Sequence, residues 1–267
     1  MLVSVLSTLA FAEEPAFAGT VAPPPEPEED KVEGHLSAEL GGSYATGNAE
    51  FLTLNGGAKG DVKWSQNQIA SVVGVNYGRA VPDTDGDGHI SDPERDAGYV
   101  ESARKAAADL RYDRFFGDRD SLYVLGGALT DPFAGYDLRT HEQLGYSHLF
   151  ITNDTTRLVG EVGFDVAQEN FVDGVDPARA DIFAARVMLG LGHAFNENVS
   201  FEDKLEVYEN VLDPNDLRLL NTASLTSKLS GKLSLKLSHA LTYDNAPVEG
   251  FEPLDQTTLL TFVATWL

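Results

Sequence analysis

One pattern constrains the fold of this chain more than any other feature. From His35 onward, stretches of ten to fourteen residues alternate apolar and polar side chains, and polar turns separate them. In one stretch, Ala108 and Leu110 alternate with Asp109 and Arg111. A period of two residues is typical of a β-strand with one apolar face, because successive side chains point to opposite faces. Twelve such stretches follow one another, so the pattern predicts an all-β fold.

The lengths of the connections distinguish a barrel from a soluble sandwich, which would also alternate. Connections after the even-numbered stretches are short, as at 65–68, whereas most others are longer, as at 80–100 and 244–256. The first hairpin, at 46–48, is a short exception. Short turns on one side and longer loops on the other are the plan of outer-membrane barrels. We therefore predict an up-and-down antiparallel transmembrane β-barrel of about 12 strands, formed by one chain.

Aromatic and apolar residues are distributed as this plan requires. After residue 20, no run approaches the ~20 apolar residues that a membrane helix needs, which excludes a helical membrane protein. Aromatic residues gather towards the predicted strand ends, where membrane barrels carry interfacial girdles. They are Tyr44, Trp64, Tyr77, Tyr112, Tyr146, Phe195, Phe201 and Trp266. Two acidic residues, Glu142 and Asp203, conflict with the pattern because they fall on the apolar side of their strands.

The first 34 residues are expected to lie outside the barrel. Residues 1–18 resemble a signal peptide, with a short apolar run and small residues at Ala10, Ala12, Ala16 and Ala18. The usual basic start is missing, so the signal would begin upstream. Residues 19–34, rich in proline and acidic side chains, predict an extended tether. The barrel would then comprise residues 35–267, in the cell outer membrane of a Gram-negative bacterium.

The chain is strongly acidic and contains no cysteine. It has 19 Lys and Arg against 42 Asp and Glu, which gives a net charge of −23. This charge excludes nucleic acid as a partner, since nucleic-acid recognition needs a basic surface. The absence of cysteine excludes disulfides, zinc–thiolate sites and thiol catalysis. Cations are the more natural partners of such a chain.

Charged residues fall on the face opposite the apolar one. If the apolar face meets lipid, the charged face lines the lumen, and its mixed signs favour a cross-linked interior or a very narrow path over a wide pore. The residues expected to point inward are Lys59, Lys63, Lys105, Asp109, Arg111, Asp113, Glu161, Asp165, Arg186, Glu202, Lys204, Glu206, Lys228 and Lys236.

Three stretches, 41–50, 112–150 and 186–206, carry a resemblance to a known family. They include the turn Thr46-Gly47-Asn48 and the segment from Tyr112 to Phe150. In this order they resemble the salt-induced outer-membrane protein family, known also as domain of unknown function 481. The resemblance implies a single-chain outer-membrane barrel of unsettled function and brings no catalytic residues. It also implies outer-membrane lipid as a partner and recognition of the last strand, 256–267, by the barrel-assembly machinery.

The strongest local motif is an acidic insertion at residues 83–94. It matches the calcium loop of an EF-hand, D-x-[DN]-x-[DN]-G-x5-E, at every specified place. Calcium binds six to eight oxygen atoms, and this loop offers that number. We predict one Ca²⁺ ion held by Asp83, Asp85, Asp87, the carbonyl of His89, Ser91 and Glu94. The alternative is an acidic surface loop that binds nothing specific. Strand and loop, rather than paired helices, are expected around it, although composition alone also allows a short helix at 97–108.

Other chemistry finds little support. The histidines lack metal-ligand spacing on one strand face, and no serine, histidine and orienting polar group converge as an esterase requires. Three functions are therefore weighed. The first is a narrow or plugged channel or envelope-maintenance barrel without enzymatic activity. The second is a surface protein whose calcium-clamped loops contact lipopolysaccharide or other cells, and the third, least supported, is a lipid-modifying enzyme.

Overall fold

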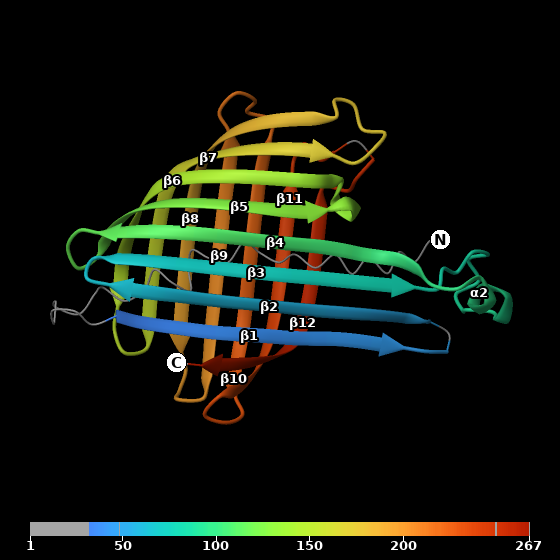
Figure 1. Ribbon diagram of the computed structural model, residues 1–267, viewed down its shortest axis with the longest axis horizontal. Helices are drawn as coiled ribbons and strands as arrows, with labels where there is room; N and C mark the ends of the chain where they lie inside the picture. Colours follow the sequence, from blue (N-terminus) through green and yellow to red (C-terminus); the bar gives the residue numbers. More distant parts are fainter. Residues whose placement is uncertain (1–31, 48, 249, 267) are drawn as a thin grey trace.

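The computed structural model describes residues 32–47, 49–248 and 250–266, and these form a closed barrel of twelve strands (Figure 1). The fold class predicted from the alternation is confirmed. The expected signal peptide and nearly all of the expected tether lie outside the described residues. The tether's last residues do not, because the first strand begins at Val32.

The strands are long enough to cross a membrane, at twelve to seventeen residues each. Their bounds are β1 Val32–Ala45, β2 Phe51–Trp64, β3 Asn67–Ala80, β4 Val100–Phe115, β5 Asp120–Asp131, β6 Tyr136–Thr152, β7 Thr156–Phe171, β8 Arg179–Ala194, β9 Val199–Asn210, β10 Leu217–Lys228, β11 Leu233–Asp244 and β12 Leu254–Trp266. A short α-helix, α2 (Asp92–Ala97), and a 3-10 turn, η1 (Pro132–Ala134), interrupt the connections. In the described part of the chain, no helix is long and apolar enough to cross a membrane.

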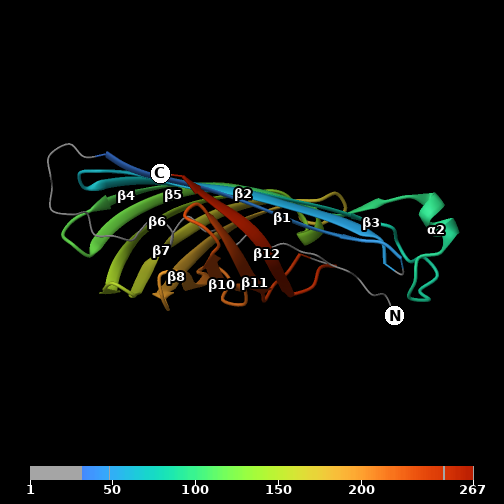
Figure 2. The same ribbon diagram turned by 90° about the horizontal axis from the view of Figure 1, so that it is seen from below.

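Each strand pairs antiparallel with its sequence neighbours, and β12 closes the barrel on β1. The closing seam pairs Leu36 with Trp266 and Leu40 with Phe262. Strands of a barrel are tilted, so the front wall crosses the back wall steeply in Figure 1. Figure 2 shows that α2 projects beyond the barrel wall, at the end of β3 and the start of β4.

The connections differ from the prediction in two places. The stretch 97–108, whose composition also allows a short helix, is mostly strand: β4 begins at Val100, and the separate helix α2 ends before it at Ala97. The connection between β5 and β6 is shorter than predicted for this side of the barrel, since it consists of only the η1 turn and Gly135. Gly135 adopts a left-handed conformation, φ 90°, which permits this tight reversal.

Large apolar side chains cover the outside of the barrel. Leu40, Leu110, Phe164 and Leu189 are all about half exposed or more, as expected for side chains that meet lipid rather than a protein core. The aromatic residues of the predicted girdles that lie on this face include Tyr44, Tyr77, Phe195 and Trp266. Glu142 and Asp203 do lie on the outer face, since their neighbours His141 and Lys204 are buried inside.

Candidate functional site

The lumen is the chemically richest part of the described structure. Nine of the fourteen charged residues predicted to point inward are buried: Asp109, Arg111, Asp113, Glu161, Asp165, Arg186, Lys204, Glu206 and Lys236. Because they alternate along each strand with exposed apolar residues, their burial places them inside the barrel rather than in its wall. The predicted assignment of the two faces is therefore confirmed.

The first half of the network in the lumen centres on Glu161 of β7. One of its carboxylate oxygens lies 2.8 Å from Nη1 of Arg111, and the other lies 2.8 Å from Nη1 of Arg186. Arg111 also donates two hydrogen bonds of 2.8 Å to Asp113. One carboxylate thus joins guanidinium groups that come from β4 and β8 on either side of it.

The second half continues the network to β9. Arg186 contacts Glu206, which in turn lies 2.9 Å from Nζ of Lys204. Arg186 also donates to the hydroxyl oxygens of Tyr123, at 2.7 Å, and Tyr208, at 3.2 Å. Charges removed from water need such partners, and here each arginine has several. The network fills the lumen between β4 and β9.

Two glycines explain how bulky groups fit into this interior. A Cβ atom built at Gly145 of β6 would overlap the ring and hydroxyl of Tyr123, and one built at Gly127 of β5 would overlap Asp109 and His141. The missing side chains therefore leave the space that Tyr123 and the 3.0 Å pair of Asp109 and His141 occupy. Glycine within a strand often marks such a close approach.

A further cluster lies near the long-loop end of the lumen, which sequence reasoning did not single out. Arg218 of β10 contacts Glu169 of β7, Asp216 at 3.2 Å and Asp244 at 3.1 Å. Arg139 of β6 lies 3.4 Å from the same Glu169. The alternation along their strands predicts that these side chains point inward. Because they lie at strand ends, the sequence pattern alone did not identify them as a cluster.

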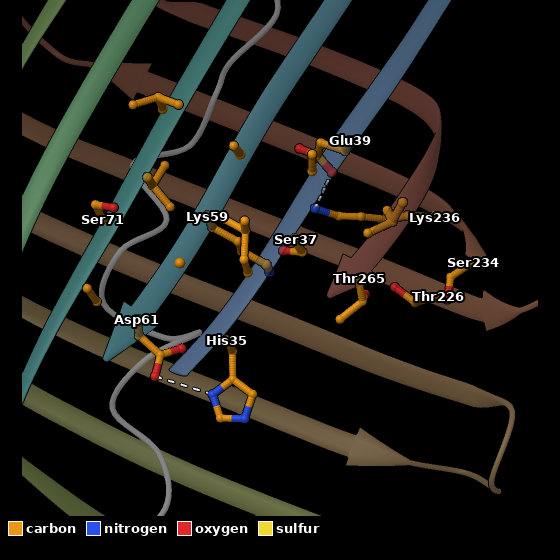
Figure 3. A pocket seen from close by; sticks show the side chains of 18 of the residues that line it. His35, Ser37, Glu39, Lys59, Asp61, Ser71, Thr226, Ser234, Lys236 and Thr265 are labelled. Atoms are coloured by element: carbon orange, nitrogen blue, oxygen red, sulfur yellow. Dashed lines mark hydrogen bonds and ion pairs between the residues drawn. The ribbon is translucent and has the colours of Figure 1, made fainter. Parts of the chain in front are cut away.

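The opposite side of the lumen is open. A cavity of about 440 Å³ lies between β1–β3 and the strands β9–β12 (Figure 3). Hydroxyl and charged groups line it, among them Ser37, Lys59, Glu202, Thr226 and Ser234. Lys236 reaches across to Glu39, 3.3 Å away, and His35 lies 3.5 Å from Asp61 (Figure 3). The lumen is thus filled on one side and hollow and polar on the other.

The predicted calcium loop lies outside the barrel, between β3 and α2. It brings together carboxylate oxygens of Asp83, Asp85 and Asp87, which lie within 4.8 Å of one another. Asp83 accepts backbone hydrogen bonds from Gly88 and Gly86, and these lower the pKa of its carboxyl group. Both glycines have φ above 70°, as the tight turn requires.

The remaining predicted ligands are arranged differently. Glu94 does not join the three aspartates: its carboxylate accepts hydrogen bonds from the backbone N–H and hydroxyl groups of Ser91 and Thr84. These bonds lower the pKa of Glu94 to about 2. Ser91 and Glu94 form a capping box at the start of α2, and His89 Nδ1 lies 2.8 Å from Asp87.

The insertion is fastened to the first hairpin. Glu50, just before β2, receives hydrogen bonds from the hydroxyl of Tyr99 (2.8 Å) and from Nε of Arg95 (2.9 Å). These two contacts lower the pKa of Glu50. Arg95 also donates to the carbonyl of Gly47, at 2.9 Å. The acidic loop is therefore held at a fixed place beside the rim of the barrel.

Solved structures with similar folds are outer-membrane barrels. The NanC porin aligns with 86% of this chain and all of its own, at 12% identity and a TM-score of 0.50. The translocator domain of the autotransporter NalP from Neisseria meningitidis aligns at 11% identity and 0.44, over 88% of each chain. An outer-membrane channel from Pseudomonas putida aligns at 9% and 0.43, over 88% of this chain and 95% of its own. No curated protein has a significant sequence match.

At these identities the structural likeness concerns the fold. The family comparison reaches further, because a single family model matches residues 38–266, nearly the whole barrel. The resemblance to domain of unknown function 481, found in three short stretches of sequence, is thereby confirmed. This chain belongs to the family described as "Protein of unknown function, DUF481".

Proposed function

We propose that the protein is an outer-membrane barrel of a Gram-negative bacterium that passes small hydrophilic solutes along a narrow, off-centre path. The observation that carries this proposal is the division of the lumen. The ion-pair network fills the side between β4 and β9, while the cavity of about 440 Å³ remains beside β1–β3. The ion-pair network argues against a wide aqueous pore, and the cavity argues against a fully packed interior.

The walls of the cavity suit small polar solutes. Lys59 and Lys236 offer positive charge, Glu39 and Glu202 negative charge, and several hydroxyl groups can donate or accept hydrogen bonds. Cavities of a few hundred cubic ångströms hold small molecules. A transport role needs no catalytic residue, in keeping with the proposal that the protein is not an enzyme.

The test is conductance through single barrels in planar lipid bilayers. Ser37→Trp places an indole in the cavity, and we expect it to abolish or strongly reduce the steady current of the unmodified barrel. Leu40→Trp is the matched control, because Leu40 lies on the same strand but faces outward at 68% exposure. No steady current from the unmodified barrel, or equal currents from both variants, would contradict the proposal.

A second function concerns the loop outside the barrel. We infer that residues 83–94 bind one Ca²⁺ ion, with Asp83, Asp85 and Asp87 supplying carboxylate oxygens. Their convergence within 4.8 Å supports this, and the turn at Gly88 matches the loop motif. Glu94, Ser91 and the His89 carbonyl would complete the site after Glu94 turns away from Thr84.

The position of this loop favours a role at the cell surface. Arg95 and Tyr99 fix the insertion to Glu50, so a bound ion would be presented at a constant place beside the rim. Calcium there can bridge to the phosphate groups of lipopolysaccharide. Binding of the purified protein to lipopolysaccharide-coated sensor chips, with and without calcium, tests this. Equal binding in both conditions would leave the channel as the sole proposed function.

A further inference from the structure

The outer face of the barrel carries polar side chains halfway along four consecutive strands. They are Asp203 on β9, Asn221 on β10, His239 on β11 and Thr258 on β12. Mid-strand positions of the same face on most other strands hold apolar residues such as Leu110 and Leu189, with Glu142 of β6 as a polar exception. This polar row therefore lies where most other strands present hydrocarbon-like surface to the membrane.

The row consists of two hydrogen-bonded pairs. Asn221 Nδ2 donates to Asp203 Oδ1 at 3.0 Å, and His239 Nδ1 lies 2.9 Å from the hydroxyl oxygen of Thr258. Ala223 lies between Asp203 and His239, because it is opposite Asp203 on one side and opposite His239 on the other. A carboxylate and an imidazole thus flank one small residue.

Lipid cannot provide hydrogen-bond partners for the side chains of this row. A carboxylate has room for several hydrogen bonds, and hydrocarbon offers none, so polar groups at this depth usually face another protein surface or water. The hydrogen bonds within the two pairs use only part of the hydrogen-bonding capacity of each polar group. The carboxylate of Asp203 and the ring of His239 would gain most from a complementary protein surface.

We propose that the outer face of β9–β12 binds the same face of a second copy of this chain. Two barrels in one membrane can be related by a two-fold axis along the membrane normal, which makes one patch self-complementary. Such an axis beside Ala223 exchanges left and right. It therefore brings Asp203 on β9 of one copy opposite His239 on β11 of the other.

The surroundings of the row agree with this arrangement. Ala223, on the axis, is small enough for two strands to approach closely, as small residues do where membrane segments pack. The apolar side chains of Leu225 and Leu237, both about half exposed, border the row and would pack against their counterparts. Polar recognition would set the register, and the leucines would supply the contact area.

Thiol cross-linking tests the proposal directly, since the chain has no native cysteine. Ala223→Cys places one thiol beside the expected axis. In outer membranes of a Gram-negative host, a short bifunctional maleimide should convert most of this variant into a dimer. Leu110→Cys, on β4, is the matched outward-facing control and should stay monomeric. Equal cross-linking of both, none at Ala223, or an adduct with a different protein would overturn the proposal.

A second variant separates recognition from folding. Asp203→Leu removes the acidic group but suits a lipid-facing position, so the barrel should still fold and migrate as a heat-modifiable band. In mild detergent, analytical ultracentrifugation should show a dimer for the unmodified protein and a monomer for this variant. A monomeric unmodified protein, or a dimer unaffected by the substitution, would also overturn it.

Discussion

The guanidinium group of Arg111 lies over the ring of Tyr123, 3.9 Å from the ring centroid. This contact ties the aromatic group on β5 to the charge network, because Arg186 donates a hydrogen bond to the Tyr123 hydroxyl. Arginine stacks well on aromatic faces while its N–H groups remain free for carboxylates. Tyr123 is almost wholly buried at 1% exposure, so it fills the lumen and connects both arginines.

Removing the central carboxylate should both weaken and open the barrel. Glu161→Gln leaves Arg111 and Arg186 without their shared charge, and breaking a buried ion pair costs about 3–5 kcal/mol. We expect a loss of that order in urea unfolding in lipid vesicles, together with a larger single-barrel conductance. Glu197→Gln, in the turn between β8 and β9, is the control and should change neither. An unchanged conductance would show that the network does not restrict the path.

A new charge should destabilise the barrel when it lies on the outer face but not when it lies in a loop. Leu189→Arg places a guanidinium in lipid near mid-membrane and should cost about 2–4 kcal/mol. Leu212→Arg, in the loop after β9, keeps its charge in water and should be nearly neutral. A substitution at the neighbouring Met188, which faces the lumen, would not serve as a control with a small effect on stability, because its side chain is buried with Leu149 and Val159. Equal unfolding midpoints for the two arginine variants would reject the assignment of faces.

Ion selectivity should follow the charge of the longer loops. The connections on that side, 46–50, 81–99, 132–135, 172–178, 211–216 and 245–253, contain thirteen acidic residues and one basic residue. Such a field concentrates cations at the mouth and weakens with salt, since the Debye length falls from about 10 Å at 0.1 M to 3 Å at 1 M. Reversal potentials should therefore show cation preference that fades as salt rises. Anion preference at low salt would contradict this.

Acid should release the insertion from the first hairpin. Contacts with Tyr99 and Arg95 lower the pKa of Glu50 below its usual 4.5. A lowered pKa means that docking is fully stabilised above pH 4.5 and is lost as the pH falls through the lower value. A spin label at Asp96→Cys should accordingly become more mobile in acid. Glu50→Gln should give the mobile spectrum already at pH 7, and an immobile label in that variant would contradict the docking role.

Much of this architecture is readable from the sequence because a barrel wall obeys one local rule. Alternation places Arg111 and Arg186 inside and Leu110 and Leu189 outside without any knowledge of the partners. The partners themselves depend on register between strands that are distant in sequence. The pairing of Glu161 with two arginines, and the cluster around Arg218, could therefore not be predicted.

In the long loop after β3, the sequence predicts which side chains come together but not the local hydrogen bonds that they form. The motif at 83–94 predicts which side chains converge, and three aspartates do so. It does not predict the capping box that holds Glu94 against Ser91 and Thr84, nor the short helix α2. These depend on local hydrogen bonds that compete with metal ligation.

Calcium should bind the insertion, and two carboxylates should contribute in distinguishable ways. Asp85 accepts one long hydrogen bond, of 3.3 Å, from the backbone N–H of Asp87. Asp85→Ala should therefore leave the metal-free loop as ordered as before, while the loss of a ligand carboxylate should abolish calcium binding. Glu94 holds the metal-free loop through Thr84 and Ser91, so Glu94→Ala should abolish binding and also loosen the loop.

Calorimetry on detergent-purified protein should give one site with a Kd of about 10⁻⁴–10⁻³ M, as in extracellular calcium modules. Magnesium should compete poorly, because it demands a smaller octahedral site. Asp96→Asn removes one acidic group from the same insertion but outside the motif, so it controls for a general loss of negative charge. In limited proteolysis, calcium should protect the unmodified loop and the Asp96→Asn variant but neither ligand variant. If Asp85→Ala binds calcium as the unmodified protein does, the three aspartates do not form the site, and the acidic loop acts only through its charge.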